Sequence, residues 1–572
     1  MKTRQIFGWV LLAAVLLTAC SKKGPSYAKY VPKSAGYVLA FDLKRLTQKL
    51  EQDSLTFENM LTVINEDKSS KAYTEALSKW NEFKDAGVDF EQKVLVAVPA
   101  LDVTAGSVSF QLVAGLKDPS KLEAFIAKQK DAPKIEKEGS LSMVDMNGVV
   151  LGWNKEAVML VGAQSTPSYD LLNDSSDAPI GAVPGAEGEK ALLKKYFDLK
   201  KDESVLSLDE FGQLMEEPAD VAVFTNSESM TGTQVSPLMA TMQSKLKDLL
   251  QGMYSTTKIN FEQGKIVVES NSFIGTKMGD LLKKFAGPVV DMSLVERYPS
   301  ANMNGVAAFS FKPELIPAFL QETGFDALAG IAMAEAGVTV DDVIKAFKGD
   351  FAIMFSDFSI QHVDQGKDAA FKAHTPFAKV LMAVRIGDKA AFEKLLNTAA
   401  SKNLIRREGN RIYPGGEELN AAVGNSVFVG IENDLLVVAS DSAIYAGYAA
   451  AKSGGALKPA AASAIKGKSL GFYVDASSIL QGISNDVFDS TDVHMKNILD
   501  RSRGTFKEMW FNTSNFDGKK ISSYGELVLA DQKNALPQLV RFLMYAADEV
   551  KLQEKMEEDM YERMEGRPSI HD

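Results

Sequence analysis

The sequence predicts an α+β fold of two tandem homologous halves, each built of antiparallel sheets with helices packed on one side. Short segments that alternate apolar and polar residues, or are rich in Val, Ile and Phe, are typical of strands. Longer amphipathic segments between them are typical of helices, and turns such as Gln263-Gly264 between strand-like runs indicate antiparallel hairpins. Similar segments recur later in the chain, which predicts a duplication.

The duplication rests on six pairs of short matching segments that occur in the same order. Their separations vary from 249 to 278 residues, as insertions would cause. No single match is persuasive, but six in one order favour tandem halves. The matched pairs are Tyr37–Lys44 with Gly305–Lys312, Ala86–Asp89 with Ala336–Thr339, Leu112–Asp118 with Met382–Asp388, Asn154–Glu156 with Glu432–Asp434, Val221–Phe224 with Leu470–Tyr473, and Gly264–Ile266 with Lys519–Ile521.

The expected segments follow one another along the chain. They are a lipoprotein signal peptide (1–19), a lipidated tether (20–29), a first α+β repeat (30–292), a second α+β repeat (293–550) and an acidic, Met-rich helix extension (551–572). In the first repeat we expect strands at 94–98, 107–116, 149–153 and 157–161, helices at 189–199 and 238–252, and a loop at 164–189. The last helix should begin at an Asn534 cap, with Pro537 in its first turn, and continue to about Glu565.

The N-terminus has the pattern of a bacterial lipoprotein signal. Lys2 and Arg4 precede an apolar run, Ile6–Leu17, which is too short for a comfortable membrane span of about 20 residues. Leu17-Thr18-Ala19-Cys20 then forms a lipobox, in which the thiol of Cys20 accepts a diacylglycerol. Two or three acyl chains would anchor the protein stably. The alternative is an ordinary secretory signal with a chance cysteine.

The amino-acid composition limits which partners the chain can bind and which cysteine chemistry it can perform. Cys20 is the only cysteine, so the chain has no intramolecular disulfide and no thiolate site further on. The formal net charge is −12, which disfavours nucleic acid as a partner. No later segment is apolar for 18 residues, so the membrane is expected to be reached through the N-terminal lipid alone. Ser21 after Cys20 favours the outer membrane, and Lys22 and Lys23, in place of an acidic cluster, favour its periplasmic face.

No motif predicts a catalytic residue, a metal site or a cofactor. The four histidines, His362, His374, His494 and His571, have no metal-ligand spacing and are interpreted as surface residues. Asp341 and Asp342 are expected to begin a helix rather than to catalyse. Calcium at Asp350, Asp357 and Asp364 is a minor alternative, because the spacing does not match an EF-hand.

Two features of the surface suggest contacts or modification. Apolar residues at a spacing of four on the acidic last helix form a stripe suited to a partner: Leu552, Met556, Met560 and Met564. The alternative is that the stripe packs on its own domain or frays as a solvated tail. Three Asp-Ser/Thr-apolar-type tripeptides resemble O-glycosylation acceptors of Bacteroidetes envelopes, with the acceptor serines Ser54, Ser442 and Ser490.

Some segments resemble an uncharacterised lipoprotein family of Bacteroidetes that is classed as a domain of unknown function. They are Tyr30–Ala35 with the following strand to Leu43, Ala336–Asp342 leading into Ala346–Phe351, and Asp531–Leu536 at the start of the last helix. The resemblance implies an envelope location and covers nearly the whole mature chain. Its motifs are turns and caps, and it implies no activity.

These observations together favour a non-enzymatic, lipid-anchored envelope protein that binds or scaffolds another component, either a protein or a glycan. The first alternative is an envelope hydrolase whose carboxylates and hydroxyls are scattered in sequence and gathered by the fold. The second is a periplasmic carrier of an apolar ligand, which would need an apolar cavity between sheet and helices.

Overall fold

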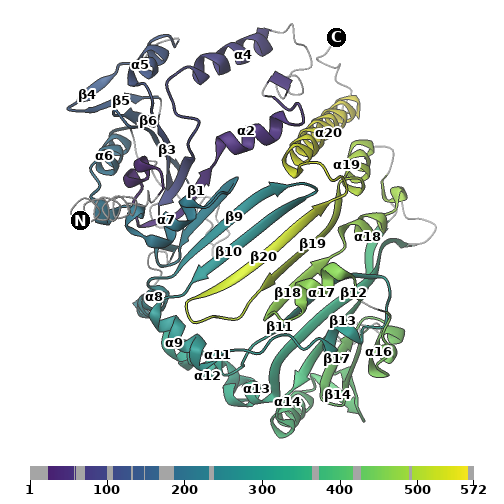
Figure 1. The fold of residues 1–572 in the computed structure, drawn as a ribbon. Coiled ribbons are helices and arrows are strands. Elements are labelled where there is room, and N and C mark those ends of the chain that lie inside the picture. The colour runs from purple at the N-terminus through teal and green to yellow at the C-terminus, as the bar shows by residue number, and fades with distance from the viewer. Residues whose placement is uncertain are drawn as a thin grey trace, which may run out of the picture. The chain divides into compact units, whose positions relative to one another are not determined.

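The computed structural model describes residues 24–56, 58–59, 71–99, 107–129, 133–146, 148–165, 186–230, 237–363, 373–416, 427–455, 457–488 and 492–564. The predicted signal peptide, Cys20, Ser490 and His571 lie outside the described residues. The chain forms two compact units: the first comprises residues up to 51, 56–235 and 253–259, and the second comprises 52–55, 236–252 and 260–572. Helices accompany antiparallel strands in both units (Figure 1), so the predicted α+β class is confirmed.

The strands of the first unit form one antiparallel sheet. Its order is β9-β8-β1-β2-β3-β7-β6-β5-β4, so β1 lies inside the sheet rather than at an edge. Of β9, residues 254–259 belong to this unit. The strands are β1 (Ala35–Phe41), β2 (Val94–Pro99), β3 (Ser107–Gly115), β4 (Glu136–Glu138), β5 (Leu141–Asp145), β6 (Val149–Trp153), β7 (Ala157–Ser165), β8 (Val221–Asn226) and β9 (Tyr254–Glu262).

The helices of the first unit connect these strands. In α5 the side chain of Asp118 accepts hydrogen bonds from the backbone N–H groups of Ser120 and Lys121, and Pro119 occupies the first turn, which explains where this helix begins. The helices are η1 (Ser26–Tyr30), α2 (Leu43–Glu51), α4 (Lys71–Lys84), α5 (Pro119–Ala127), α6 (Ala186–Phe197), η3 (Lys201–Glu203), η4 (Val205–Ser207), α7 (Asp209–Glu216) and η5 (Glu228–Met230).

The strands of the second unit also form an antiparallel sheet. Its order is β10-β20-β19-β18-β11-β12-β13-β17-β16-β15-β14. The strands are β10 (Lys265–Phe273), β11 (Met303–Ser310), β12 (Phe347–Val363), β13 (Ala373–Ile386), β14 (Ile405–Glu408), β15 (Arg411–Pro414), β16 (Phe428–Glu432), β17 (Leu435–Ala439), β18 (Leu470–Val474), β19 (Phe506–Thr513) and β20 (Lys520–Leu529).

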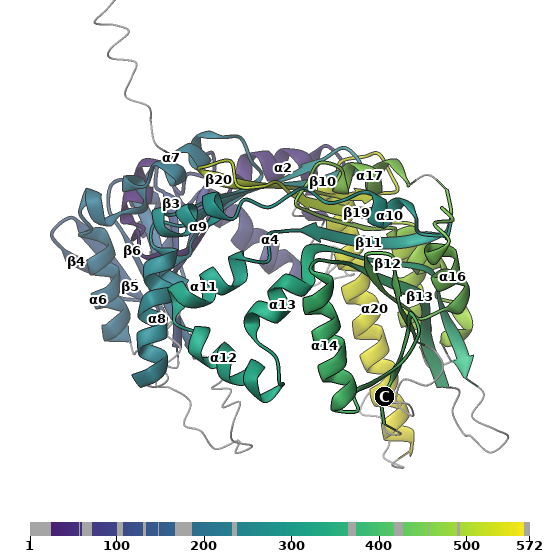
Figure 2. The same cartoon turned by 90° about the horizontal axis from the view of Figure 1, so that it is seen from below.

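The helices of the second unit include a neighbouring pair, α13 and α14, which Figure 2 shows side by side. Asp388 caps α14 by accepting from the backbone N–H of Ala391, as Asp118 caps α5. The helices are α8 (Pro237–Leu250), α9 (Thr276–Lys284), α10 (Ser293–Glu296), α11 (Leu315–Thr323), α12 (Asp326–Glu335), α13 (Val340–Ala346), α14 (Lys389–Ser401), α16 (Ser442–Ala449), α17 (Pro459–Ile465), α18 (Ala476–Gln481), η7 (Asn485–Val487), α19 (Val493–Arg503) and α20 (Ala535–Met564).

The predicted elements agree with the observed ones to within a few residues. The four strands expected in the first repeat are β2, β3, β6 and β7, and the two expected helices are α6 and α8. The side-chain oxygen of Asn534 accepts from the backbone N–H of Leu536 at 3.0 Å, as expected of the cap of α20. Most of the loop expected at 164–189 lies outside the described residues.

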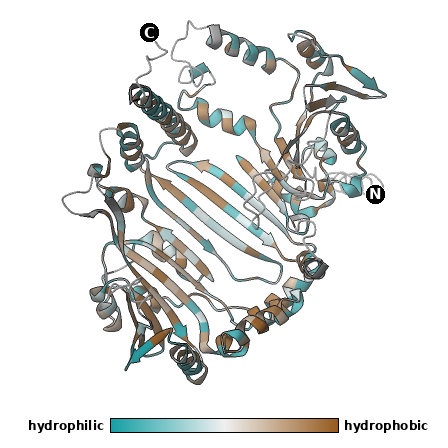
Figure 3. Cartoon of the chain, turned by 180° about the vertical axis from the view of Figure 1, so that it is seen from behind, coloured by the Kyte–Doolittle hydropathy of each residue, from teal (hydrophilic) through white to brown (hydrophobic). Residues whose placement is uncertain are grey.

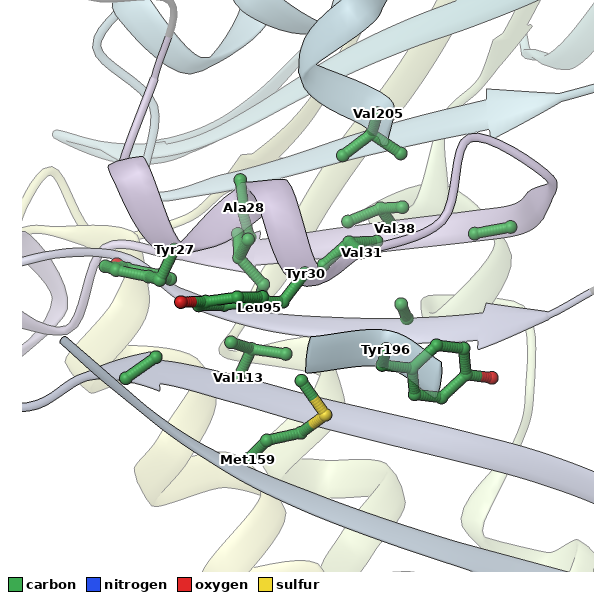
Figure 4. Close-up of a cluster of buried hydrophobic side chains, with 14 of the residues drawn as sticks. Tyr27, Ala28, Tyr30, Val31, Val38, Leu95, Val113, Met159, Tyr196 and Val205 are labelled. Atoms are coloured by element: carbon green, nitrogen blue, oxygen red, sulfur yellow. The ribbon is translucent and has the colours of Figure 1, made fainter. Parts of the chain in front are cut away.

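One prediction about packing is wrong, because helices cover both faces of each sheet. In the first unit η1, α6 and α7 pack against one face, in the cluster shown in Figure 4, whose strand residues include Val113. On the other face α5 packs against the neighbouring residue Ala114. The second unit repeats this with α10, α16 and α17 on one face and α14 on the other. Figure 3 marks hydrophobic residues in brown along these strands. Strands that are apolar on both faces need cover on both.

Candidate apolar ligand site

The second face of the first sheet carries an unbroken row of apolar side chains. Since successive side chains point to opposite faces, residues that are register partners on neighbouring strands lie side by side on one face. Every member of the row is half-buried, although each is aliphatic. In order across strands β8, β1, β2, β3, β7 and β6, the row is Val223, Leu39, Val96, Leu112, Leu160 and Leu151.

A large cavity lies over part of this row. Its volume is about 790 Å³, within the range of ~300–1,000 Å³ that is usual for small-molecule sites. Its floor is formed by strands β2, β3, β6 and β7. Three large side chains of its walls come from helices: Phe83 from α4, and Phe125 and Ile126 from α5. The full lining is Leu43, Phe83, Val88, Phe90, Val94, Leu112, Ala114, Leu122, Phe125, Ile126, Gln129, Pro133, Asp145, Met146, Leu151, Val158 and Leu160.

The polarity of the lining is very uneven. Gln129 and Asp145 are the polar side chains among the described lining residues, and the others are aliphatic, aromatic, Met or Pro. Phe83 and Met146 are 37% and 42% exposed, so water reaches the site past apolar side chains. Exposed apolar surface costs about 25 cal/mol per Å², and protein interiors are normally packed with few voids. An apolar occupant would remove that cost.

A buried carboxylate organises one wall of the cavity. Asp89 is 7% exposed and lies between Val88 and Phe90, which line the cavity. It accepts hydrogen bonds from Gln92 Nε2 at 2.7 Å and from the backbone N–H of Glu91 at 3.1 Å, and it pairs with Lys117 Nζ at 2.8 Å. Burial raises the pKa of Asp89, but these hydrogen bonds, that from Lys117 first, outweigh it and leave the pKa below its usual value.

Comparison with known proteins places the chain in a family without giving it an activity. The model of a domain of unknown function, DUF4836, matches residues 27–536. The chain belongs to this family. This confirms the predicted resemblance to a domain of unknown function, whereas the Bacteroidetes and lipoprotein parts of that expectation stay predictions. No curated protein sequence matches the chain.

Two solved structures are also distantly similar to this DUF4836 chain. Crystal form I of TP0453 is 12% identical, with a TM-score of 0.22, and the match covers 43% of this chain and 78% of that one. Crystal form IV of TP0453 is 9% identical, with a TM-score of 0.23, and the match covers 44% and 83%.

The predicted partner stripe lies on α20, and its described side chains differ in exposure. Leu552 is 50% exposed, Met560 is 37% exposed, and Met556 is half-buried; the side chain of Met564 lies outside the described residues. The buried face of the same helix carries Glu549 and Gln553. Met556 and Met560 follow Gln553 by three and seven residues and therefore lie on the same side of α20 as this buried residue. A partner surface at the stripe stays a prediction.

The predicted O-glycosylation serines differ in setting. Ser54 and Ser442 are exposed, while Ser490 lies outside the described residues. The aspartates of the two described motifs have structural partners, since Asp53 pairs with Arg541 and Asp441 caps α16 by accepting from the backbone N–H of Ile444. Modification of these serines stays a prediction.

The histidines have neighbours that sequence spacing does not reveal. His494 Nδ1 lies 2.6 Å from Glu549 Oε2, between α19 and α20, so this residue is not the free surface histidine that we expected. In the backbone register of β12 and β13, His362 lies opposite His374, although their side chains lie outside the described residues. The hydrogen bond from His494 helps to lower the pKa of Glu549, against the effect of burial.

The aspartates considered as caps or ligands have ordinary structural partners. Thr339 caps α13 and Asp342 completes the capping box, which confirms that the two aspartates begin a helix. A hydrogen bond from Lys394 and those from Thr339 lower the pKa of Asp342 to about 2. Asp350 accepts a hydrogen bond from the hydroxyl of Ser310, and Asp357 forms an ion pair with Lys379, so the two aspartates have different partners. Asp364 lies outside the described residues.

Neither a metal centre nor a membrane span is found in the described part of the chain. No group of three or more His, Cys, Asp or Glu there could hold a metal ion. None of its helices combines the length and the continuous apolarity that a membrane crossing requires. The sequence did not predict which residues form the cavity, because its lining comes from several separated segments. Its signal in the sequence was the apolar character of both faces of β2, β3 and β7.

Proposed function

We propose that this protein is a lipid-anchored envelope protein that binds a small apolar ligand in the cavity of its first unit. The observation that carries the proposal is the cavity of about 790 Å³, whose described lining residues are apolar except for Gln129 and Asp145. Of the functions considered from the sequence, the carrier of an apolar ligand was the one that required such a cavity between sheet and helices.

The chemistry of the lining favours binding over hydrolysis. A hydrolytic site gathers an acid, a base or a nucleophile within hydrogen-bonding distance of one another. Among its described lining residues the cavity has one carboxylate residue, Asp145, and one amide residue, Gln129, beside apolar ones. Two described carboxylates with lowered pKa values, Asp89 and Asp475, are engaged by lysines in ion pairs. These are structural arrangements.

The experiment is a titration of the purified, unlipidated protein with the neutral fluorophore N-phenylnaphthylamine. We expect saturable binding with an increase in emission, and at least ten-fold weaker binding by Leu160→Trp, because the larger ring would project from the floor into the cavity and take space from the ligand. The matched control is Val438→Trp, a half-buried position on β17 of the second unit. Absence of saturable binding, or equal loss in both variants, would contradict the proposal.

The membrane anchor is a separate part of the proposal. It is supported by the lipobox Leu17–Cys20, by the charged and apolar segments before it and by the absence of any other cysteine in the sequence. The residues after Cys20 support the periplasmic face of the outer membrane. An anchored carrier would hold its apolar ligand close to the bilayer from which such ligands come.

We also propose that the chain contains two homologous halves, as the sequence suggested. The supporting observation is the strand order: β9-β8-β1-β2-β3-β7-β6-β5-β4 in one sheet has the same order as β19-β18-β11-β12-β13-β17-β16-β15-β14 in the other. Each strand number differs by ten. Two unrelated sheets of nine strands would not be expected to share this connectivity.

The packing supports the same correspondence. The caps Asp118 and Asp388 begin equivalent helices, α5 and α14. The apolar row on the second face of the first sheet also has a counterpart, at the same strand positions. In order across β18, β11, β12, β13, β17 and β16, the counterpart is Phe472, Ala307, Ile353, Met382, Val438 and Val429.

A second candidate function is protein binding through α20. The observation that favours it is the exposure of two apolar side chains, Leu552 and Met560, beside acidic residues such as Glu554, Glu557 and Glu558. This surface fits a partner with an apolar groove edged by basic side chains. Affinity capture from membranes with the double variant Leu552→Ser and Met560→Ser should lose a partner that the wild type retains. Equal capture by both would contradict this candidate.

A further inference from the structure

We infer that the open face of the second sheet binds the hydrocarbon chain of a lipid molecule. This site lies in the second unit, and it goes beyond the proposed function because it does not depend on the first-unit cavity. Five neighbouring strands of this sheet have one face packed under helices and one face that is apolar and open to solvent.

The strands β20, β19, β18, β11 and β12 present three rows of register partners on the open face. Successive side chains point to opposite faces, so register partners lie side by side. None of the residues in the rows is charged, and the two polar ones, Thr513 and Ser523, share a hydrogen bond of 3.0 Å. The rows are Leu527, Met509, Val474, Gly305 and Phe355; Gly525, Phe511, Phe472, Ala307 and Ile353; and Ser523, Thr513, Leu470, Phe309 and Phe351.

Contacts between side chains agree with this assignment of the face. The rings of Phe309 and Phe351 stack with their centroids 4.8 Å apart. The ring of Phe355 occupies the space that a Cβ on Gly305 would take, so this glycine lets the ring lie across the neighbouring strand. The rows therefore form a continuous apolar surface.

The same strands are buried on the other face only. There Val306 and Ala352 are at most 1% exposed, in the cluster that α10, α16 and α17 cover. On the open face Met509 is 40% exposed, Leu470 and Ile353 are each 37% exposed, and the other apolar side chains of the rows are half-buried. The solvated face of an antiparallel sheet normally carries polar residues. An exposed apolar patch is typical of an interaction surface.

The size of the patch favours a single hydrocarbon chain over a second copy of the protein. With strands about 4.8 Å apart and alternate residues about 6.8 Å apart, the rows cover about 480 Å². A standard protein interface buries about 800 Å² on each partner. A hydrocarbon chain needs no such area, and it has no charge or polar group that this face would leave unsatisfied.

The helices beside the patch favour the same occupant. Figure 2 shows α14 and α20 on one side of the sheet, with α10 and α17 on the other. The helix α14 packs on the neighbouring part of the open face, against Leu436 of β17. With 13 and 30 residues, α14 and α20 are about 20 and 45 Å long. They obstruct a flat bilayer or a second copy, whereas a slender chain can lie along the strands between them.

The test is photolabelling of the purified, unlipidated full chain with a hexadecanol that carries a diazirine at mid-chain. Because this protein has no acyl chain of its own, the label can come only from the added probe. Irradiation attaches the probe to the side chains that it touches, and mass spectrometry of the digested protein locates the labelled peptides. We expect saturable labelling of peptides from β12, β18 and β19, distinct from any labelling of the cavity residues between 43 and 160.

Two exposed positions allow the face to be changed with little effect on folding. The double variant Ile353→Lys and Met509→Lys places two ammonium groups in the rows, and a bound hydrocarbon chain would desolvate them. Labelling of the three strands should fall at least about five-fold, while labelling within 43–160 stays unchanged. The matched control is Leu404→Lys with Val289→Lys, whose side chains are 55% and 48% exposed and lie outside the strands. It makes the same change of net charge and should be labelled as the wild type is.

The outcomes separate this site from the first-unit cavity. Labelled cavity peptides with unlabelled β12, β18 and β19 would overturn the inference and leave the proposed function standing. Labelled strands with unlabelled cavity peptides would support the inference and count against the cavity. Equal losses in the double variant and its control would overturn the inference. A wild-type dimer in sedimentation that the double variant converts to a monomer would also overturn it, because the face would then belong to a second copy.

Discussion

Single residues set the shape of the cavity through the turn that ends at Phe90. Asp89 is buried and its oxygens receive a lysine, an amide and a backbone N–H, so the carboxylate is satisfied in its ionised form. The two residues beside it, Val88 and Phe90, are thereby fixed against the cavity. Asp89 is not itself a lining residue, but it positions two apolar residues that line the cavity.

Asp89→Asn should lower the free energy of unfolding by about 1–2 kcal/mol at neutral pH, since it weakens hydrogen bonds to a buried charge. The pKa of Asp89 is lowered in the folded protein, so its stabilising effect is present above the unfolded value, about 3.9, and is lost as the pH falls below it. Urea unfolding from pH 7 to pH 3 measures this. The difference between variant and wild type should shrink in acid. Glu123→Gln, in an exposed pair with Lys137, should change stability by less than about 1 kcal/mol.

At the scale of elements, local sequence was sufficient where local interactions decide. The strand β6, the start of α13 and the cap of α20 all depend on residues within one or two turns of the element. The pairing of His494 with Glu549 could not be predicted, because the residues are 55 positions apart and meet only when α19 packs on α20. The same limit hid the cavity, whose walls come from distant segments.

The turn after α4 gives a test of one such element. Gly87 has a φ of +83°, and a Cβ built on it would lie 2.3 Å from the carbonyl oxygen of Asp118. Gly87→Ala should therefore cost about 2 kcal/mol or more, the left-handed strain plus the displacement of the start of α5. Gly139, with a φ of +57° and nothing within 4 Å, is the matched control, and Gly139→Ala should cost only the strain, about 1 kcal/mol. Equal losses in urea unfolding would show that the contact with Asp118 is unimportant.

On the scale of the whole molecule, the sequence suggested helices on one side of each sheet, and the structure has them on both. The reason is visible in β3, where Val113 faces one cluster and Ala114 the other. A strand with two apolar faces appears in the sequence as a continuous apolar segment. Such a segment does not predict which elements pack against it. In the first unit the cover of the second face is incomplete, and that incompleteness is the candidate site.

We expect the whole molecule to be attached to the membrane through Cys20 alone. Replacing Cys20 by Ser should abolish incorporation of a labelled fatty acid, because the oxygen cannot form the thioether, and Ser21→Ala should leave incorporation unchanged. A chain in which residues 1–20 are replaced by an ordinary cleavable secretory signal should move from the membrane fraction to the soluble periplasmic fraction, since the sequence offers no other apolar segment of 18 residues. If that chain stays with the membrane, a second attachment exists; if Cys20→Ser still incorporates the label, the lipobox interpretation is wrong.

The soluble form should bind N-phenylnaphthylamine as the anchored one does, because the cavity lies within residues 43–160 and depends on neither Cys20 nor its lipid.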